Sequence, residues 1–508
     1  MKFNVNGSFR SGDERRYFMV NVHESNSLLY EMIKDGKFIT LCGPRASGKS
    51  TRMEQSTNFL RKLNFLVFKI TLQGICTDST KSYDFWNNIG HLLTPYFTIS
   101  INLQSAADFM QLFRVHHGEQ KKRIVLYIDE FDVLRSNNTI LTDLLDALRG
   151  IKSSITSYHL HSVVIIGVVG IHHLNTTDRN RSPFNTTEIL VVPNLQLDGI
   201  RDMFNTFSQC RNCTIDDEVI QNVFEVTNGH AGLVSMCGRE IETHCLNGKT
   251  ELDLAKWKRH YNTNLHDWLL QFPTMQRLLQ DLREDHNLQR YILQYAIGSN
   301  VIIRETGALG EHYDALLSLG VTSEITLDTG TIHFGRSQIS SPLLRTILLL
   351  YLEYHDVKPK ISADILYSNG HLNIKDIIVH ALLLIPVEDI KLAIRKMFKK
   401  CGQQFVPHEY FYHAHMIMIL RQSLNQLEYS ISMEAKSKDN LKRVDIMIAR
   451  RDERGEEELD PEGRYIIELM ATDTAEKSQR DHIDKSVHYG SMFNAKHMWM
   501  IHVVCCDD

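Results

Sequence analysis

The segment that most constrains this chain is a short glycine-containing stretch near its amino end. Residues 43–50 read GPRASGKS and match the pattern GxxxxGK[ST] at every defined position. An apolar run from Phe38 to Leu41 precedes the stretch, and a helical pattern opens after it at Thr51. A glycine-rich turn between a strand and a helix is typical of a phosphate-binding loop. The sequence therefore predicts a nucleotide site here.

The chemistry of such a loop assigns a contact to each part of it. Glycines let consecutive backbone N–H groups turn around the β-phosphate, and the N-terminus of the following helix adds a favourable dipole. Lys49 is expected to reach the β- and γ-phosphates and so to act in catalysis, and the Ser50 hydroxyl is expected to join a Mg2+ shell. The residues expected to bind the cofactor are Gly43, Pro44, Arg45, Ala46, Ser47, Gly48, Lys49, Ser50 and Thr51.

A second apolar run, residues 123–130 (RIVLYIDE), ends in two acids. A continuous apolar run is typical of a buried parallel strand, and open α/β sheets bind ligands at the carboxyl ends of their strands. Asp129 is therefore expected to hold Mg2+ through water, and Glu130 to polarise the water that attacks the γ-phosphate. The alternative for Glu130 is a solvated or helix-capping acid, and the same alternative applies to Asp132.

Strands and helices alternate around these two motifs. The runs 65–72, 162–170 and 188–195 favour strands, and residues 138–150 have helical periodicity. Such alternation predicts an α/β fold in which helices cover both faces of a parallel sheet.

Four groups of residues together resemble a known family. They are Arg45 in the loop, Ile128–Asp132, Ser182–Asn185 and Thr227–Leu233. This set is similar to the AAA-ATPase-like proteins, which include the P-loop NTPase modules of Crinkler-type effectors from fungi and oomycetes. The resemblance covers about the first half of the chain and implies a RecA/AAA-like core that hydrolyses ATP with Mg2+. In relatives the last segment reads Gly-His-Pro-Gly and opens a lid helix, whereas here Ala231 stands at the proline position.

The patterns downstream predict several further domains. Helical periodicity after residue 198 favours a lid, an alternating run around Asp328-Thr329-Gly330 favours a hairpin, and residues 361–400 favour helices. The expected division is an N-terminal extension (1–27), a P-loop NTPase core (28–197), a helical lid (198–250), a winged-helix-like and helical connector (251–400) and a restriction-endonuclease-like, PD-(D/E)xK α/β domain (401–508).

The last hundred or so residues contain the second candidate site. A helical stretch at 409–424 precedes three strand-like runs at 429–433, 444–449 and 464–470, and Asp445 and Glu468 lie in the second and third. Clustered carboxylates hold Mg2+, which activates water for attack on a phosphodiester. The arrangement resembles PD-(D/E)xK nucleases, so Asp445 and Glu468 are expected to be metal ligands and catalytic residues, with DNA as the candidate partner.

One position departs from the nuclease pattern. The lysine expected two residues after Glu468 is Met470, whose thioether carries no charge. Lys477 or Lys485 could supply the cation from the following helix. Two other interpretations stay open: a fold that binds nucleic acid without cutting it, and an ordinary α/β domain whose acids are unconnected.

Composition limits the remaining possibilities. At 508 residues, of which 43% are hydrophobic, the chain has room for about three folded domains. The net charge of -5 provides no overall attraction to nucleic acid, so such contacts would need local patches. No apolar run approaches the ~18 to 20 residues that span a bilayer, and the start lacks a secretory signal. We expect an intracellular protein of the cytoplasm or nucleus, or of a host nucleus if it is an effector, with no membrane partner; an oligomer is compatible with the sequence.

Overall fold

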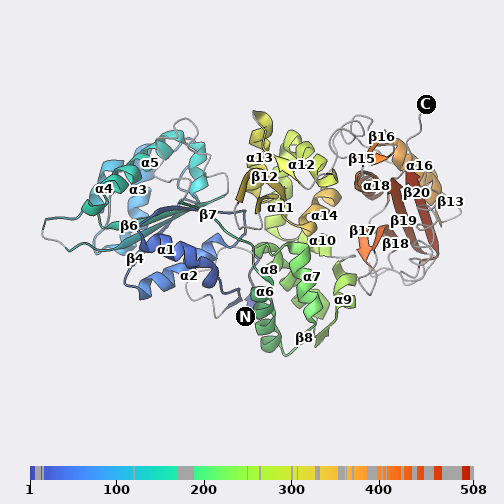
Figure 1. The fold of residues 1–508 in the computed structure, drawn as a ribbon, viewed down its shortest axis with the longest axis horizontal. Coiled ribbons are helices and arrows are strands. Elements are labelled where there is room, and N and C mark those ends of the chain that lie inside the picture. Colours follow the sequence, from blue (N-terminus) through green and yellow to red (C-terminus); the bar gives the residue numbers. More distant parts are fainter. Residues whose placement is uncertain are drawn as a thin grey trace. The chain divides into compact units, whose positions relative to one another are not determined.

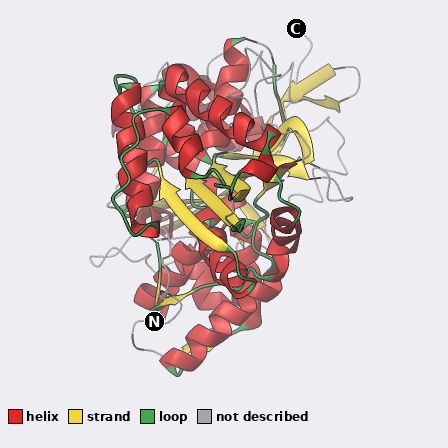
Figure 2. Cartoon of the chain, turned by 90° about the vertical axis from the view of Figure 1, so that its left-hand side faces the viewer, coloured by secondary structure: helices red, strands yellow, loops and turns green. Residues whose placement is uncertain are grey.

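The fold is that of a computed structural model, and the secondary structure below refers to the part of the chain that it describes (Figures 1 and 2). That part comprises residues 1–5, 13, 16–117, 120–168, 188–246, 248, 250–261, 265–298, 301–305, 307–326, 332–352, 361, 363–368, 371–385, 398–401, 404–407, 409–424, 428–436, 443–450, 463–471 and 495–503. The chain forms two compact units. The first contains Met1–Cys210, Gly229–Ser235 and Glu305–Glu324, and the second contains Arg211–Asn228, Met236–Arg304 and Ile325–Asp508.

A five-stranded parallel sheet forms the centre of the first unit. Its strand order is β4-β5-β6-β3-β7. The strands are β3 (Phe38–Cys42), β4 (Leu66–Thr71), β5 (Ile124–Asp129), β6 (Leu160–Gly167) and β7 (Ile189–Val191). The predicted parallel α/β core is therefore confirmed. Because β6 lies between β3 and β5, the carboxyl ends of the two motif-bearing strands flank the same neighbour.

Helices cover both faces of this sheet, as Figure 1 shows. On one face lie α1 (Ser27–Lys34) and α2 (Lys49–Lys62); on the other lie α3 (Ser82–Leu93), α4 (Ala106–Leu112) and α5 (Asn138–Ser153). Successive strand residues point to opposite faces. Val125 and Tyr127 accordingly pack with α1 and α2, whereas Leu126 and Ile128 pack with the opposite helices. Both faces of β5 are buried, which explains its continuous apolar run.

The first residues of the chain are packed into this unit. β1 (Lys2–Phe3) pairs in parallel with β2 (Tyr17–Phe18). The rings of Phe3 and Phe18 are buried and lie 5.1 and 5.3 Å from the ring of Phe207 in α6 (Leu197–Arg211). The described amino end thus contributes to a hydrophobic core instead of extending away from it.

Helices dominate the first part of the second unit. They include α7 (Asp217–Thr227), α9 (Leu254–His260), α11 (Pro273–Glu284), α12 (His286–Gly298) and α14 (Pro342–Tyr351), while α8 (Ala231–Glu240) begins in the first unit and α13 (Ala308–Leu319) belongs to it. A small sheet has the order β10-β12-β11, formed by β10 (Ile302–Ile303), β12 (Ile332–Ile339) and β11 (Thr322–Thr326). β11 and β12 are neighbours in this sheet and lie on either side of the predicted turn in sequence, so the two strands of the predicted hairpin are confirmed.

The prediction of helices across residues 361–400 holds only in part, because the described residues of this range also form strands. Between α15 (Ala363–Leu366) and α16 (Ile374–Leu383), strand β13 (Tyr367–Ser368) pairs with β14 (His371–Leu372), and β15 (Phe398–Cys401) pairs with β16 (Gln404–Pro407). In each pair two residues separate the paired strand ends, and the first separation is Asn369-Gly370. Asn-Gly is the strongest short hairpin signal, and it outweighs the helical spacing around it.

The carboxyl-terminal part contains a four-stranded sheet of order β17-β18-β19-β20. Its strands are β17 (Tyr429–Lys436), β18 (Arg443–Arg450), β19 (Arg464–Ala471) and β20 (His497–Val503), and α18 (Glu409–Ser423) precedes them. β17, β18 and β19 run antiparallel, and β20 is parallel to β19. The predicted helix and strands are present, with boundaries within three residues of those expected.

Replacing Asn137 with Ala should destabilise α5. The buried Asn137 side chain accepts the N–H of Ile140 at the helix start and donates to the carbonyls of Thr77 (3.2 Å) and Thr80 (2.9 Å). Loss of the cap and of these bonds should lower the free energy of opening α5 by about 2 kcal/mol, measured by hydrogen exchange with mass spectrometry.

The matched control is Asn138→Ala. The neighbouring Asn138 side chain is exposed, and its change should alter the protection of α5 by less than about 0.5 kcal/mol. Equal protection in the two variants would contradict the capping role of Asn137.

Candidate nucleotide-binding site

The phosphate loop occupies the turn between β3 and α2. Two of its residues have left-handed backbone conformations, with φ of 57° at Ala46 and 89° at Gly48. A Cβ atom at Gly43 would lie 2.9 Å from the Ser47 hydroxyl and 3.1 Å from the Cβ of Val192. Alternating backbone handedness of this kind turns N–H groups toward one concave side, which is a common anion-binding arrangement. The predicted loop residues thus connect β3 to α2, as expected for a strand–turn–helix segment.

Lys49 lies inside the loop. Its Nζ donates to the carbonyl oxygens of Gly43 (2.9 Å) and Pro44 (2.7 Å). Burial lowers the pKa of Lys49, while the charges of Asp129, Asp132 and Glu130 oppose that shift. The ammonium group of the partly buried Lys49 therefore lies against two carbonyl oxygens of the loop. This donor set suits the β- and γ-phosphates of a nucleotide.

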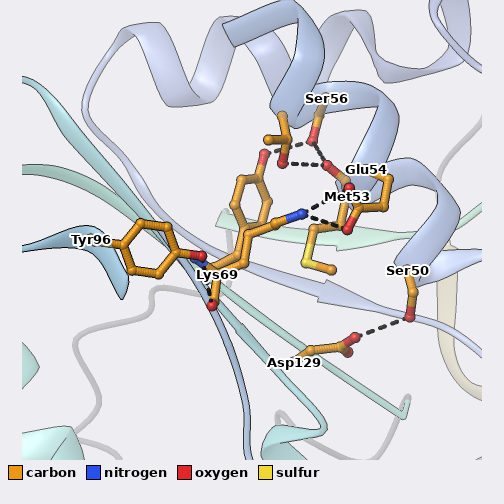
Figure 3. A network of polar contacts seen from close by, with 9 residues as sticks. Ser50, Met53, Glu54, Ser56, Lys69, Tyr96 and Asp129 are labelled. Carbon is orange, nitrogen blue, oxygen red and sulfur yellow. Dashed lines mark hydrogen bonds and ion pairs between the residues drawn. The ribbon is translucent and has the colours of Figure 1, made fainter. Parts of the chain in front are cut away.

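Ser50 and Asp129 come together across the sheet. The Ser50 hydroxyl donates to Oδ2 of Asp129 at 3.0 Å (Figure 3). The N–H of Glu130 donates to Oδ1 of Asp129 at 2.9 Å. Burial raises the pKa of Asp129, and these two hydrogen bonds and Lys49 act in the other direction. A hydroxyl and a carboxylate are hard oxygen ligands of the type that Mg2+ prefers. Ser50 and Asp129, which are 79 positions apart in sequence, thus form a candidate metal-binding site.

Glu130 occupies a strained position directly after the strand. Its φ is 57°, and it precedes the short helix Phe131–Ser136 at the cap position, but its side chain makes no capping hydrogen bond. Partial burial, followed by the charges of Asp129 and Asp132, raises the pKa of Glu130. The side-chain capping alternative is not observed. Asp132 differs, because its Oδ1 accepts the N–H of Val168 at 3.3 Å and so ties the helix to the end of β6.

Polar contacts beneath the loop hold α2 in place. Lys69 on β4 donates to both carboxylate oxygens of Glu54 (2.6 and 2.8 Å), and the Ser56 and Tyr127 hydroxyls lie 2.7 Å apart (Figure 3). Both Glu54 and Ser56 are buried. These contacts anchor the helix that carries Ser50 to two strands. These contacts were not predicted from the sequence, although Lys69 and Tyr127 stand out as polar residues within otherwise apolar strands.

The segment that resembles Gly-His-Pro-Gly lies against the outside of the loop. Gly229–Ser235 belongs to the first unit although its sequence neighbours on both sides do not. A Cβ at Gly48 would lie 3.7 Å from the Cβ of Ala231. Thr51, the last of the predicted cofactor-binding residues, follows in the first turn of α2.

The two predicted acids of the carboxyl-terminal sheet also meet. Asp445 accepts the N–H of Leu469 at 2.7 Å through Oδ2, and its own N–H donates to Oε1 of Glu468 at 3.4 Å. Nε2 of the buried His413, on α18, lies 3.1 Å from the same Oδ2. His413 was not predicted as a site residue, because nothing in the helical pattern indicates which strand residue it faces.

Some expected features fall elsewhere. Ser182–Asn185, Lys477 and Lys485 lie outside the described residues, and Met470 lies within β19. Among the described residues, no group of three or more His, Cys, Asp or Glu side chains is arranged to hold a metal. Within the same part of the chain, none of the helices combines the length and apolar character needed to cross a bilayer.

Comparison with known proteins agrees with the geometry of the loop. Residues 32–175 match the family model described as the AAA domain. The chain is 31% identical over 112 residues to ABC transporter G family member 5 of Oryza sativa subsp. japonica, a match covering 22% of this chain and 14% of that protein. The chain thus spans about a seventh of the length of that curated relative.

Solved structures show similarity at low identity. A Walker-type ATPase of Pyrococcus abyssi aligns with a TM-score of 0.45 and 16% identity, covering 68% of this chain and 99% of that one. The Orc1 protein of Aeropyrum pernix, solved in complex with DNA, aligns with a TM-score of 0.36 and 14% identity over 65% of this chain and 92% of that one.

Changing Lys49 to Ala should weaken nucleotide binding at least tenfold. The substitution removes a charge-assisted contact worth roughly 1.5 to 3 kcal/mol. Isothermal titration with ATP and Mg2+ would measure the loss. Lys62→Ala is the control, because Lys62 is an exposed residue at the other end of the same helix. Unchanged affinity in the Lys49 variant would contradict the assignment of the loop.

Proposed function

We propose that the protein binds and hydrolyses ATP with Mg2+, and that its nucleotide state controls a carboxyl-terminal nuclease-like domain that acts on or binds DNA. The observation that supports ATP binding best is the 3.0 Å hydrogen bond between Ser50 and Asp129, beside the partly buried Lys49. These groups would hold the metal and the phosphates. ATP is favoured over GTP by the AAA-type match and because no guanine-recognition motif is evident in the sequence.

In the proposed reaction the protein supplies orientation and charge. The loop amides and Lys49 would hold the β- and γ-phosphates, and Ser50 and Asp129 would hold Mg2+, which would supply positive charge to offset the charge of the phosphates. Glu130 accepts a hydrogen bond from the attacking water and directs it toward the γ-phosphate. Its raised pKa, caused mainly by partial burial, makes the carboxylate a better proton acceptor than a fully solvated one.

Replacing Glu130 with Gln should slow ATP hydrolysis by about 100-fold or more while ATP affinity stays within about twofold. The amide keeps the size of the side chain but cannot accept the proton. Phosphate release under single-turnover conditions would measure the rate, and titration would measure affinity. Hydrolysis at the wild-type rate would assign the water-orienting role to another residue.

The nuclease part of the proposal rests on the meeting of Asp445 and Glu468. β18 and β19 are antiparallel, and the pairing of Ile446 with Ile467 sets a register in which Asp445 and Glu468 lie opposite each other on adjacent strands. Both side chains are only partly exposed. Carboxylates on adjacent strands could share one Mg2+ ion. A water molecule bound to that ion would then attack a phosphodiester.

One observation favours a second candidate function. Oδ2 of Asp445 already accepts the Leu469 N–H and lies beside His413 Nε2, so the oxygen best placed for a metal has two partners within the protein. This arrangement suits an inactive nuclease fold used for docking to nucleic acid or protein, with the ATPase as a slow signalling or effector switch.

A cleavage assay separates the two functions. Purified protein with Mg2+ should cut single- or double-stranded DNA, with a rate that changes when ATP is added, and Asp445→Ala should abolish cutting while leaving ATP hydrolysis within about twofold of wild type. Absence of cutting by the wild-type protein, with ATP hydrolysis intact, would favour the docking function. Cutting that persists in the Asp445 variant would contradict the assigned site.

A further inference from the structure

The lid segment bonds to two consecutive peptide groups of the phosphate loop. Nε2 of His230 lies 3.1 Å from the carbonyl oxygen of Arg45, and the N–H of Gly232 donates to the carbonyl oxygen of Ala46 at 3.0 Å. All four residues belong to the first unit. The chain therefore uses residues almost two hundred positions downstream to fix the orientation of the loop.

The hydrogen bonds determine the state of the imidazole. A carbonyl oxygen can only accept, so Nε2 of His230 must carry the proton. Nδ1 faces the N–H of Leu233 at 3.4 Å and must therefore be the acceptor. Both ring nitrogens are thus used by a neutral imidazole. Burial of the ring, with Lys49 nearby, lowers the pKa of His230 to about 4, which agrees with this tautomer.

The direction of these bonds matters for the inner side of the loop. In a trans peptide the C=O and N–H point in opposite directions. Holding the Arg45 and Ala46 carbonyls outward therefore turns the N–H groups of Ala46 and Ser47 toward the other side. The N–H of Ser47 indeed donates to the Pro44 oxygen (3.3 Å), which also accepts Lys49 Nζ. That side is the one where a phosphate would bind.

The backbone at Ala46 requires such support. Its φ of 57° is unfavourable for a residue with a side chain, at a cost of about 1 kcal/mol or more. A strained conformation persists only where the surroundings hold it. The bonds from His230 and Gly232 lie on either side of this residue, and a Cβ added to Gly232 would come within 2.8 Å of the Ala46 side chain, so the approach is close.

We propose that His230 is a positioning residue that holds the phosphate loop in its nucleotide-binding shape and thereby couples the lid to nucleotide affinity. This inference rests on the proposed ATP binding and deepens it. Because α8 begins at Ala231, next to His230, a movement of this helix would reach the loop through the hydrogen bonds of His230 and Gly232. The role is distinct from contact with the nucleotide, since His230 bonds to the carbonyl side of the loop.

The test compares two substitutions of similar size. In His230→Gln the amide can donate to the Arg45 oxygen and accept from Leu233, whereas His230→Met fills the space without a strong donor. We expect Met to weaken binding of ATP and Mg2+ roughly five- to tenfold, the loss of about one hydrogen bond, and Gln to stay within about twofold of wild type. Isothermal titration at pH 7.5 measures affinity, and thermal unfolding without nucleotide checks the fold.

The control removes a similar bond elsewhere in the same unit. Nε2 of His161 lies 3.0 Å from the Lys34 carbonyl at the amino end of the sheet, so His161→Gln and His161→Met should both bind ATP as the wild type does. Equal affinity of the two His230 variants would overturn the inference. Failure of the wild-type protein itself to bind ATP would instead overturn the proposed function.

Discussion

The candidate site depends on the parallel alignment of β3, β6 and β5. In such an arrangement all carboxyl ends lie at one edge, so a loop that follows β3 and an acid that ends β5 reach the same place. The hydrogen bond from Ser50 to Asp129 forms because this alignment brings the two residues together. Apolar burial on both faces of the strands maintains it, because a shift of any strand would expose side chains from one core or the other.

Around that edge, the protein uses buried polar contacts to prevent the loop from changing shape. The ion pair of Lys69 and Glu54 ties α2 to β4. His230 and Gly232 hydrogen-bond to carbonyl oxygens of the loop. Buried polar groups are costly unless they are paired, so each of these contacts favours one arrangement over its alternatives. The phosphate loop is therefore held in its binding shape by the protein itself, with a strained residue, Ala46, at its centre.

Sequence patterns predicted the parts of the fold whose order is local. The strands that carry residues 38–41 and 123–129, and the helix after the loop, follow from apolar runs and a glycine pattern, and all are present. The same reasoning failed at 367–372, where helical spacing concealed a short strand pair around Asn369-Gly370. It also could not find His413, because the register between a helix and a distant sheet depends on packing that no local pattern records.

The sequence by itself determined which groups are available at the first candidate site: the loop amides, Lys49, Ser50 and the acids at 129 and 130, at the spacings of a phosphate-binding pattern. Only the tertiary structure decided which distant segments complete it. The contact of His230 with the Arg45 carbonyl and the meeting of Asp445, Glu468 and His413 arise from how elements pack. Packing joins residues by distance in space, and separation along the chain does not encode that distance.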